Sequence, residues 1–225
     1  MRTSDEINWS TYNNLYRWEM HNLVNNLKHS LFIGDWEIDS DNELVIRDNI
    51  HANWREIYTL VHKLKPNSIF ECGFGGCYHL KNIHTIRPEA KISGVELLRE
   101  QMSFGIELSN LPDHIVNNLM IADFSKDISH LNIPKHEFVY TQAVVMHLST
   151  EKAVNFLKNM ASISSKYIFL VEGMRNHENY YDLVKGALPN HKFEFIHNHL
   201  EEPVEFAKNK PGVDYTCCIL LTKED

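Results

Sequence analysis

An apolar run that leads into an acidic residue and a cluster of glycines is the segment best suited to chemistry. It spans residues 68–77 and reads Ser-Ile-Phe-Glu-Cys-Gly-Phe-Gly-Gly-Cys. Glycines directly after a strand let the backbone turn sharply and approach a ligand without a Cβ in the way. Tyr78 stands where the dinucleotide fingerprint G-x-G-x-x-G needs its third glycine, so the phosphate-binding motif is incomplete. The Glu71 carboxylate would repel a phosphate and favours a cationic or amine-bearing ligand.

Three later apolar runs also end in residues that are able to bind a ligand. They end at Glu96, at Asp123 with Phe124, and at Thr141 with Gln142, and His147 follows the last of them. Ligands of open parallel sheets bind at the carboxyl ends of the strands, so we expect these residues around one site. A histidine with its ordinary pKa of about 6.5 is able to take a proton from a hydroxyl or an amine at neutral pH.

In this order the motifs resemble those of the class I S-adenosylmethionine-dependent methyltransferases, over about residues 53–222. The first motif of that family is an acidic residue, any residue and then Gly-x-Gly, which Glu71, Gly73 and Gly75 match. The resemblance implies S-adenosylmethionine as the cofactor and S-adenosylhomocysteine as the product. It also implies the cofactor contacts: Glu71, Gly73 and Gly75 at the methionine end, Glu96 at the ribose hydroxyls, Asp123 and Phe124 at the adenine, and Thr141 and Gln142 near the transferable methyl.

Some of these residues have a simpler explanation that the sequence leaves open. Glu96 could be an acid favoured by the positive end of the next helix, and Asp123 could belong to a surface turn. His147 could be the catalytic base of the reaction or only a packing residue. The strand before it lacks the acidic residue that many relatives carry at its end, which puts an acid-dependent step in doubt.

The substrate-binding residues are expected in two other segments. The loop after the fifth predicted strand contains Arg175 and His177, and such loops face the substrate in this architecture. Arg175 could pair with an anionic substrate or be one more surface cation. In the amino-terminal segment Tyr16 and Trp18 are the candidates, because we expect this aromatic region to close over the cofactor as a lid.

The elements that position these residues alternate between strands and helices. Such a chain builds a mostly parallel sheet with helices on both faces, which is a single-domain, Rossmann-like, doubly wound α/β fold. We expect seven strands with the last one antiparallel. The predicted strands are 68–72, 91–95, 118–122, 137–141, 167–171, 192–197 and 215–221, and the predicted helices are 50–64, 78–86, 98–108, 151–163 and 180–187.

The amino-terminal region is expected to be a separate layer. Apolar residues recur every three or four positions over residues 12–31, which predicts an amphipathic helix. Residues 34–49 are acidic and predict a hairpin or a loop. The chain therefore divides into a helical extension or lid at residues 1–50 and a methyltransferase domain at residues 51–225.

Composition limits the function further. The chain has 225 residues and a net charge of −8, which argues against binding to nucleic acid, because such binding needs clustered Lys and Arg. No signal peptide or membrane-spanning segment is apparent, so we expect a cytoplasmic protein without a membrane partner. The spacing of the four cysteines suits neither disulfides nor zinc, and His197 with His199 is not completed into a metal site.

The sequence therefore predicts a methyltransferase that acts on an oxygen or nitrogen of a small molecule. A weaker similarity to methyltransferases of bacterial capsule clusters points to a phosphoramidate or sugar precursor. Two alternatives stay open: a non-catalytic binding module on the same sheet, and a nicotinamide-dependent oxidoreductase, which Tyr78 in place of the third glycine disfavours. The sequence does not determine the oligomeric state.

Overall fold

The structure is a computed structural model that describes residues 36–41, 43–46, 52–173, 177, 179–198 and 216–224. Within these residues a mixed sheet of seven strands forms the centre of the chain. Its strands are β3 Ser68–Cys72, β4 Lys91–Glu96, β5 Leu119–Ile121, β6 His136–Gln142, β7 Ser164–Gly173, β8 His191–Asn198 and β9 Thr216–Lys223. They lie in the order β5-β4-β3-β6-β7-β9-β8.

One strand of this sheet runs against the others. Strands β5, β4, β3, β6 and β7 pair in parallel, whereas β9 pairs antiparallel with both β7 and β8. The predicted doubly wound α/β fold, with seven strands and an antiparallel last strand, is confirmed. Strands β8 and β9, which follow one another along the chain, are neighbours in the sheet and pair antiparallel.

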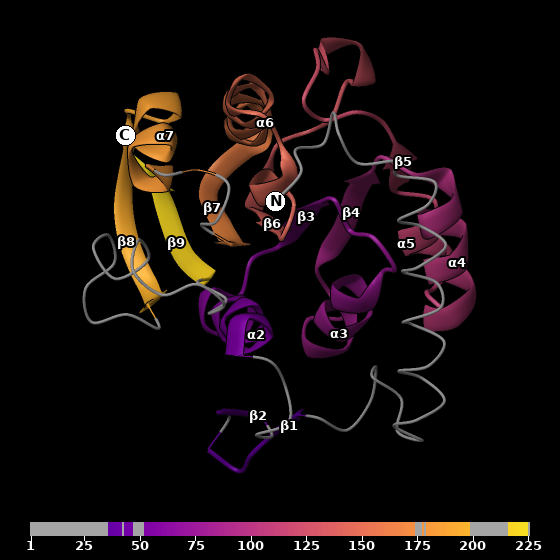
Figure 1. Ribbon diagram of the computed structural model, residues 1–225. Coiled ribbons are helices and arrows are strands. Elements are labelled where there is room, and N and C mark those ends of the chain that lie inside the picture. Colours follow the sequence, from indigo (N-terminus) through magenta and orange to yellow (C-terminus); the bar gives the residue numbers. More distant parts are fainter. Residues whose placement is uncertain are drawn as a thin grey trace, which may run out of the picture.

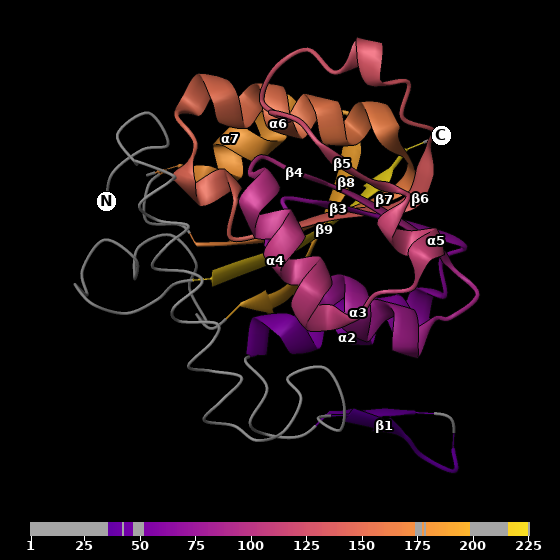
Figure 2. The ribbon, with the colours of Figure 1, turned by 90° about the vertical axis from the view of Figure 1, so that its right-hand side faces the viewer.

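Helices cover both faces of the sheet. Those in the described residues are α2 Ala52–Leu64, α3 Tyr78–Ile86, α4 Arg99–Ser109, α5 Asp113–Val116, α6 Thr150–Ile163 and α7 Tyr180–Ala187, with 3-10 turns η1 Ser129–Leu131 and η2 Val145–His147. Helices α6 and α7 lie on one face, and α2, α3 and α4 lie on the other (Figures 1 and 2). Helix α6 ends where β7 begins, so β7 starts three residues earlier than the sequence predicted.

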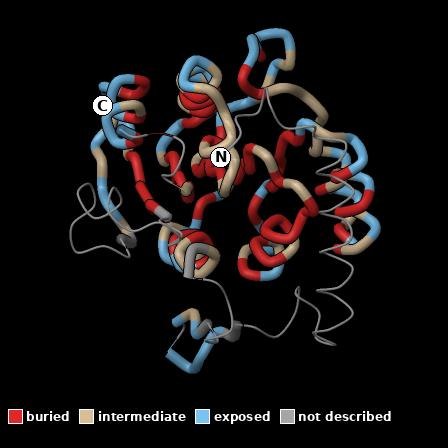
Figure 3. Tube along the Cα trace, in the orientation of Figure 1, coloured by how far each residue is buried: buried red, intermediate tan, exposed pale blue. Residues whose placement is uncertain are grey.

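The sheet divides the buried core into two layers, because successive side chains of a strand point to opposite faces. Ile69 and Phe138 pack with the layer under α2 and α3, whereas Phe70 and Val139 pack with the layer under α6 and α7. Figure 3 shows the buried residues concentrated along the central strands and the inner faces of the helices.

The segment before α2 contains a small hairpin. Strands β1 Trp36–Ile38 and β2 Leu44–Ile46 pair antiparallel, and Asp39 Oδ1 accepts the backbone N–H groups of Asp41 and Glu43 at the turn, each at 2.9 Å. The hairpin alternative predicted for residues 34–49 is therefore present. The helix predicted for residues 12–31 lies outside the described residues.

The strand order creates a crevice at the carboxyl ends of the central strands. The chain passes from β3 outward to β4 and β5 and then returns to place β6 on the other side of β3. At such a reversal the connections leave the sheet in opposite directions and open a space between them. The glycine cluster after β3 and the segment after β6 both lie at this reversal.

Candidate active site

A cavity of about 440 Å³ lies at the carboxyl edge of the sheet. This size is within the range of small-molecule sites. Its wall includes the ends of β3, β4, β5 and β6, with contributions from α2, α3, α4 and α6. The sequence-predicted residues that line it are Glu71, Gly73, Gly75, Glu96, Asp123, Phe124, Gln142 and His147.

The glycine loop folds tightly against its neighbours. Gly73 and Gly75 have positive φ angles of 80° and 50°, a backbone region that glycine adopts without strain. Gly73 N–H donates to Val95 O at 2.7 Å, which ties the loop to β4. A Cβ at Gly73 would lie 2.4 Å from Val144 Cγ2, so the segment after β6 leaves no space for a side chain. Gly73 is therefore required by the local structure as well as by any ligand.

Glu71 presents a buried carboxyl group to the cavity. Its side chain is 1% exposed, and Oε2 has no hydrogen-bond partner among the described residues. Burial raises the pKa of Glu71 to about 8, and the negative charge of Glu96 adds to the shift. A cationic ligand would compensate both carboxylates, which supports the preference expected from the sequence.

Glu96 joins the glycine loop to the start of α4. Its Oε2 accepts Gly75 N–H at 2.8 Å, while Oε1 accepts the N–H groups of Leu97 at 2.8 Å and Leu98 at 3.1 Å. Burial raises the pKa of Glu96, although these three donors oppose the shift. These contacts tie Glu96 to the segment that leads into α4, and the same carboxylate lines the cavity.

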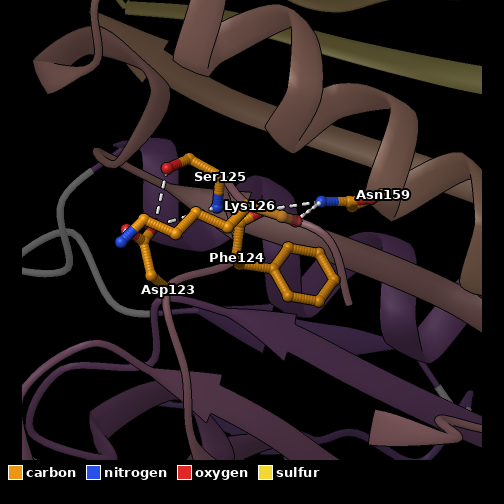
Figure 4. Close-up of polar contacts among 5 residues, drawn as sticks. All are labelled: Asp123, Phe124, Ser125, Lys126 and Asn159. Atoms are coloured by element: carbon orange, nitrogen blue, oxygen red, sulfur yellow. Dashed lines mark hydrogen bonds and ion pairs between the residues drawn. The ribbon is translucent and has the colours of Figure 1, made fainter. Parts of the chain in front are cut away.

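Asp123 lines the cavity just after β5, and Figure 4 shows its polar contacts. Its Oδ1 accepts Ser125 N–H at 3.1 Å and the Ser125 hydroxyl at 2.6 Å, and Oδ2 lies 3.4 Å from Lys126 Nζ. Burial raises the pKa of Asp123, but the Ser125 and Lys126 contacts outweigh it, so the net pKa is lowered. Asp123 is therefore an ionised acceptor at neutral pH.

Phe124 forms part of the apolar wall next to Asp123. Its ring packs on Phe70 and Phe156, with centroid distances of 6.1 and 5.4 Å, and only 4% of the residue is exposed. Asn159 Nδ2 donates to Phe124 O at 2.9 Å and to Lys126 O at 2.7 Å, which fixes this turn against α6 (Figure 4).

Thr141 and Gln142, two neighbouring residues at the end of β6, have different surroundings. Gln142 lines the cavity, but Thr141 is fully buried and is not part of its wall. The Thr141 hydroxyl donates to Cys72 O at 2.9 Å and so joins β6 to β3. His147 lies in η2 and lines the cavity, and burial lowers its pKa, which keeps the imidazole neutral at pH 7.

An aromatic cluster on α2 and α3 was not predicted for the site. Trp54, Tyr78 and His79 line the cavity, and the Trp54 ring lies 4.6 Å from that of Tyr78. His79 Nδ1 is 3.0 Å from the hydroxyl of the fully buried Tyr58. Burial lowers the pKa of His79 to about 3, so it offers a neutral imidazole. The apolar spacing of these helices predicts burial but does not distinguish a core face from a cavity wall.

Of the four predicted substrate-binding residues, the structure describes His177 alone. Tyr16, Trp18 and Arg175 lie outside the described residues. His177 is buried beneath the segment after β6, where its Nε2 donates to Val145 O at 3.0 Å. It is not part of the cavity wall.

Comparison with known proteins was made by sequence and by structure. No protein-family model matches the chain, and no curated protein matches it in sequence. A TehB-like S-adenosylmethionine-dependent methyltransferase from Corynebacterium glutamicum is similar in structure, with a TM-score of 0.62, 13% identity, and coverage of 96% of this chain and 100% of that one. The chain has the fold of the class I S-adenosylmethionine-dependent methyltransferases.

Two further structures with this methyltransferase fold were crystallised with S-adenosylmethionine. One is the magnesium protoporphyrin IX methyltransferase of Synechocystis PCC 6803, with a TM-score of 0.58, 11% identity, and coverage of 76% of this chain and 78% of that one. The other is human N-acetylserotonin methyltransferase, with a TM-score of 0.54, 15% identity, and coverage of 77% of this chain and 52% of that one.

The described residues also bear on metal binding, membrane spans and reactive thiols. No group of three His, Cys, Asp or Glu side chains among them could hold a metal ion. The described residues also include no helix long and apolar enough to cross a membrane. All four cysteines are buried and unpaired, and burial raises the pKa of Cys77, so a thiolate nucleophile is disfavoured at neutral pH.

Proposed function

We propose that the protein is an S-adenosylmethionine-dependent methyltransferase that acts on an oxygen or nitrogen of a small molecule. The observation that carries this proposal is the convergence of Glu71, Glu96 and Asp123 from three strand ends on one cavity of about 440 Å³. The methyltransferase fold supports it independently. Three carboxyl groups suit a ligand with a positive charge, several hydroxyls and an exocyclic amine.

The residues present fit the cofactor that this proposal requires. Glu71 and the glycine loop would hold the cationic methionine end, and Glu96 has acceptor capacity left for ribose hydroxyls. Asp123 would accept from the adenine amine, and Phe124 would cover the ring. Gln142 lies at the end of β6, where we place the transferable methyl. Thr141 would act only by supporting this strand end, since its hydroxyl is bonded to Cys72 O.

Catalysis at such a site depends mainly on alignment. When bound, S-adenosylmethionine supplies a methyl group that the sulfonium makes reactive. His147, which lines the cavity after β6, would take the proton that an acceptor hydroxyl or amine gives up. Holding the two reactants in line and excluding water contributes about 7–11 kcal/mol in favourable cases. The apolar wall built by Trp54, Tyr78 and Phe124 serves this exclusion.

Asp123→Ala is expected to weaken binding of S-adenosylhomocysteine by about 10- to 100-fold in a calorimetric titration. A hydrogen bond to a charged group contributes about 1.5–3 kcal/mol, which corresponds to this range. Asp127→Ala is the matched control, because Asp127 also accepts the N–H and hydroxyl of a serine two residues later, at 2.9 and 3.0 Å, but does not line the cavity. Equal effects of the two substitutions would reject the adenine-site assignment.

His147→Asn is expected to lower turnover by about 10²- to 10⁴-fold if the acceptor loses its proton to this imidazole. Binding of S-adenosylhomocysteine should stay within about threefold of the wild type. The pKa of His147 is lowered by burial, so activity should decline as the pH falls through a value below 6.5. Turnover that persists in the variant would show that His147 only packs against the cavity.

A capsule phosphoramidate or sugar precursor is the first acceptor to test, on the weaker sequence similarity. The N-acetylserotonin and plantazolicin methyltransferases show that the fold also serves other molecules.

Residues 1–50 are proposed as a lid over residues 51–225. Deletion of residues 1–20 is expected to weaken S-adenosylhomocysteine binding and to lower turnover, which binding and activity assays would measure. Unchanged binding and unchanged turnover in the truncated protein would contradict the proposed lid.

The two alternative functions make different predictions. Tyr181 and Lys185 have the Tyr-x-x-x-Lys spacing of short-chain oxidoreductases, but both lie in α7 and neither lines the cavity. Tyr181 instead stacks on Phe195, with ring centroids 5.7 Å apart. Binding of a reduced nicotinamide cofactor would support the oxidoreductase. Binding of S-adenosylmethionine without turnover over a broad acceptor panel would support a non-catalytic module.

A further inference from the structure

The irregular segment after β6 supplies a large part of the cavity wall. Gln142, Ala143, Val144, His147 and Leu148 all line the cavity. The segment has little regular structure of its own, because η2 is only three residues long and Ala143 has a φ of 54°, in the left-handed region that non-glycine residues rarely adopt. Its shape must therefore be imposed by neighbouring parts of the chain.

Two side chains from the end of β7 and the following loop bond to this segment from beneath. Glu172 Oε1 accepts Val144 N–H, and Glu172 Oε2 accepts Met146 N–H, both at 3.1 Å. His177 Nε2 donates to the carbonyl oxygen of Val145 at 3.0 Å. Backbone groups of three consecutive residues are thus bound by a carboxyl group and an imidazole.

Both of these side chains are buried and away from the ligand space. Glu172 is fully buried and His177 is 6% exposed, and neither lines the cavity. Their effect reaches the cavity through the backbone, because Val144 lies directly against Gly73 of the glycine loop. Movement of this segment would therefore alter the β6 side and the glycine-loop side of the wall together.

We propose that Glu172 and His177 are positioning residues that hold residues 143–147 in the shape of the cavity wall. The inference rests on the proposed function, because it assigns the held segment to the cofactor and acceptor site. It also gives His177 a role different from the substrate contact expected from the sequence. The carboxyl group needs both of its oxygens, since an amide would turn one of the two acceptors into a donor facing an N–H group.

Glu172→Gln tests the positioning role directly. We expect amide exchange of Val144 or Met146, followed by NMR, to accelerate at least tenfold, with an upfield shift of the affected amide proton. Exchange in β3 should stay unchanged, and S-adenosylhomocysteine should bind at least threefold more weakly. Glu194→Gln is the matched control, because Glu194 is exposed on β8 and does not line the cavity.

His177→Phe is the second variant, in case Glu172→Gln does not fold. It keeps a ring of similar size and removes only the donor to Val145 O, so we expect the same changes at smaller amplitude. Unchanged exchange at residues 144–146 in a folded variant would overturn the proposal, and so would faster exchange with unchanged ligand affinity. Failure of the wild type to bind S-adenosylhomocysteine would instead reject the proposed function. The exchange rates would still show whether Glu172 and His177 position residues 143–147.

Discussion

Gly105→Ala is expected to destabilise the protein by about 1–3 kcal/mol or more and to abolish binding of S-adenosylhomocysteine, although Gly105 does not line the cavity. Gly105 lies in α4 against the glycine loop. A Cβ there would lie 2.5 Å from Gly76 C and 2.7 Å from Gly76 Cα and O. These are backbone atoms, so the loop itself must move. The helix-propensity gain of about 1 kcal/mol from replacing glycine by alanine is too small to offset the clash.

Gly186→Ala provides the matched control with the opposite sign. Gly186 also lies within a helix, α7, and nothing stands within 4 Å of the position of its Cβ. We expect this variant to gain up to about 1 kcal/mol of stability and to bind the ligand as the wild type does. Urea unfolding and calorimetry measure both properties. Destabilisation by both substitutions, or by neither, would contradict the packing of α4 on the glycine loop.

Glu71→Gln is expected to be more stable than the wild type, by a difference in the free energy of unfolding that grows as the pH rises. The pKa of Glu71 is about 8 in the folded state against 4.5 for an ordinary glutamate. Between these values the unfolded chain releases the proton while the folded protein keeps it, so wild-type stability falls as the pH increases. The amide does not titrate. The advantage of the variant should therefore grow between pH 4.5 and 8, to about 5 kcal/mol, and then level off.

Urea unfolding of both proteins at a series of pH values measures this difference. Burial also raises the pKa of Glu172, to about 7, but this group is present in both proteins and its contribution cancels in the comparison. Glu194→Gln controls for the loss of an exposed negative charge. Glu71→Gln should also bind S-adenosylmethionine more weakly, because the amide offers no negative charge to a cation. A stability difference that does not change with pH would contradict the buried carboxyl group.

Local patterns were sufficient to predict the strand ends and the glycine loop. Residues 69–72 are all buried because β3 is covered on both faces, and the glycines mark the turn that follows. The helix predicted at residues 78–86 coincides with α3, in which His79, Ile83 and Ile86 are buried at the three- to four-residue spacing of a helix. Strand ends that lie next to one another in a parallel sheet then place Glu71, Glu96 and Asp123 together.

Contacts between distant segments were not accessible from the sequence. Glu172 and His177 bond to residues 26 to 32 positions earlier in the chain, through the pairing of β6 with β7. Trp54 and His79 reach the cavity only because α2 and α3 pack side by side, which their spacing does not reveal. Its position beside Gln142 was not sufficient to predict the surroundings of Thr141, because the Thr141 hydroxyl donates to Cys72 O and does not face the cavity.

Calorimetric titration of the wild-type protein with S-adenosylhomocysteine, S-adenosylmethionine and NADH tests the central claim most directly. We predict micromolar binding of the first two at one site per chain and no binding of NADH. The absence of binding by S-adenosylhomocysteine and S-adenosylmethionine at millimolar concentration would contradict the methyltransferase assignment and leave only the fold. Tighter binding of NADH would replace the assignment with an oxidoreductase.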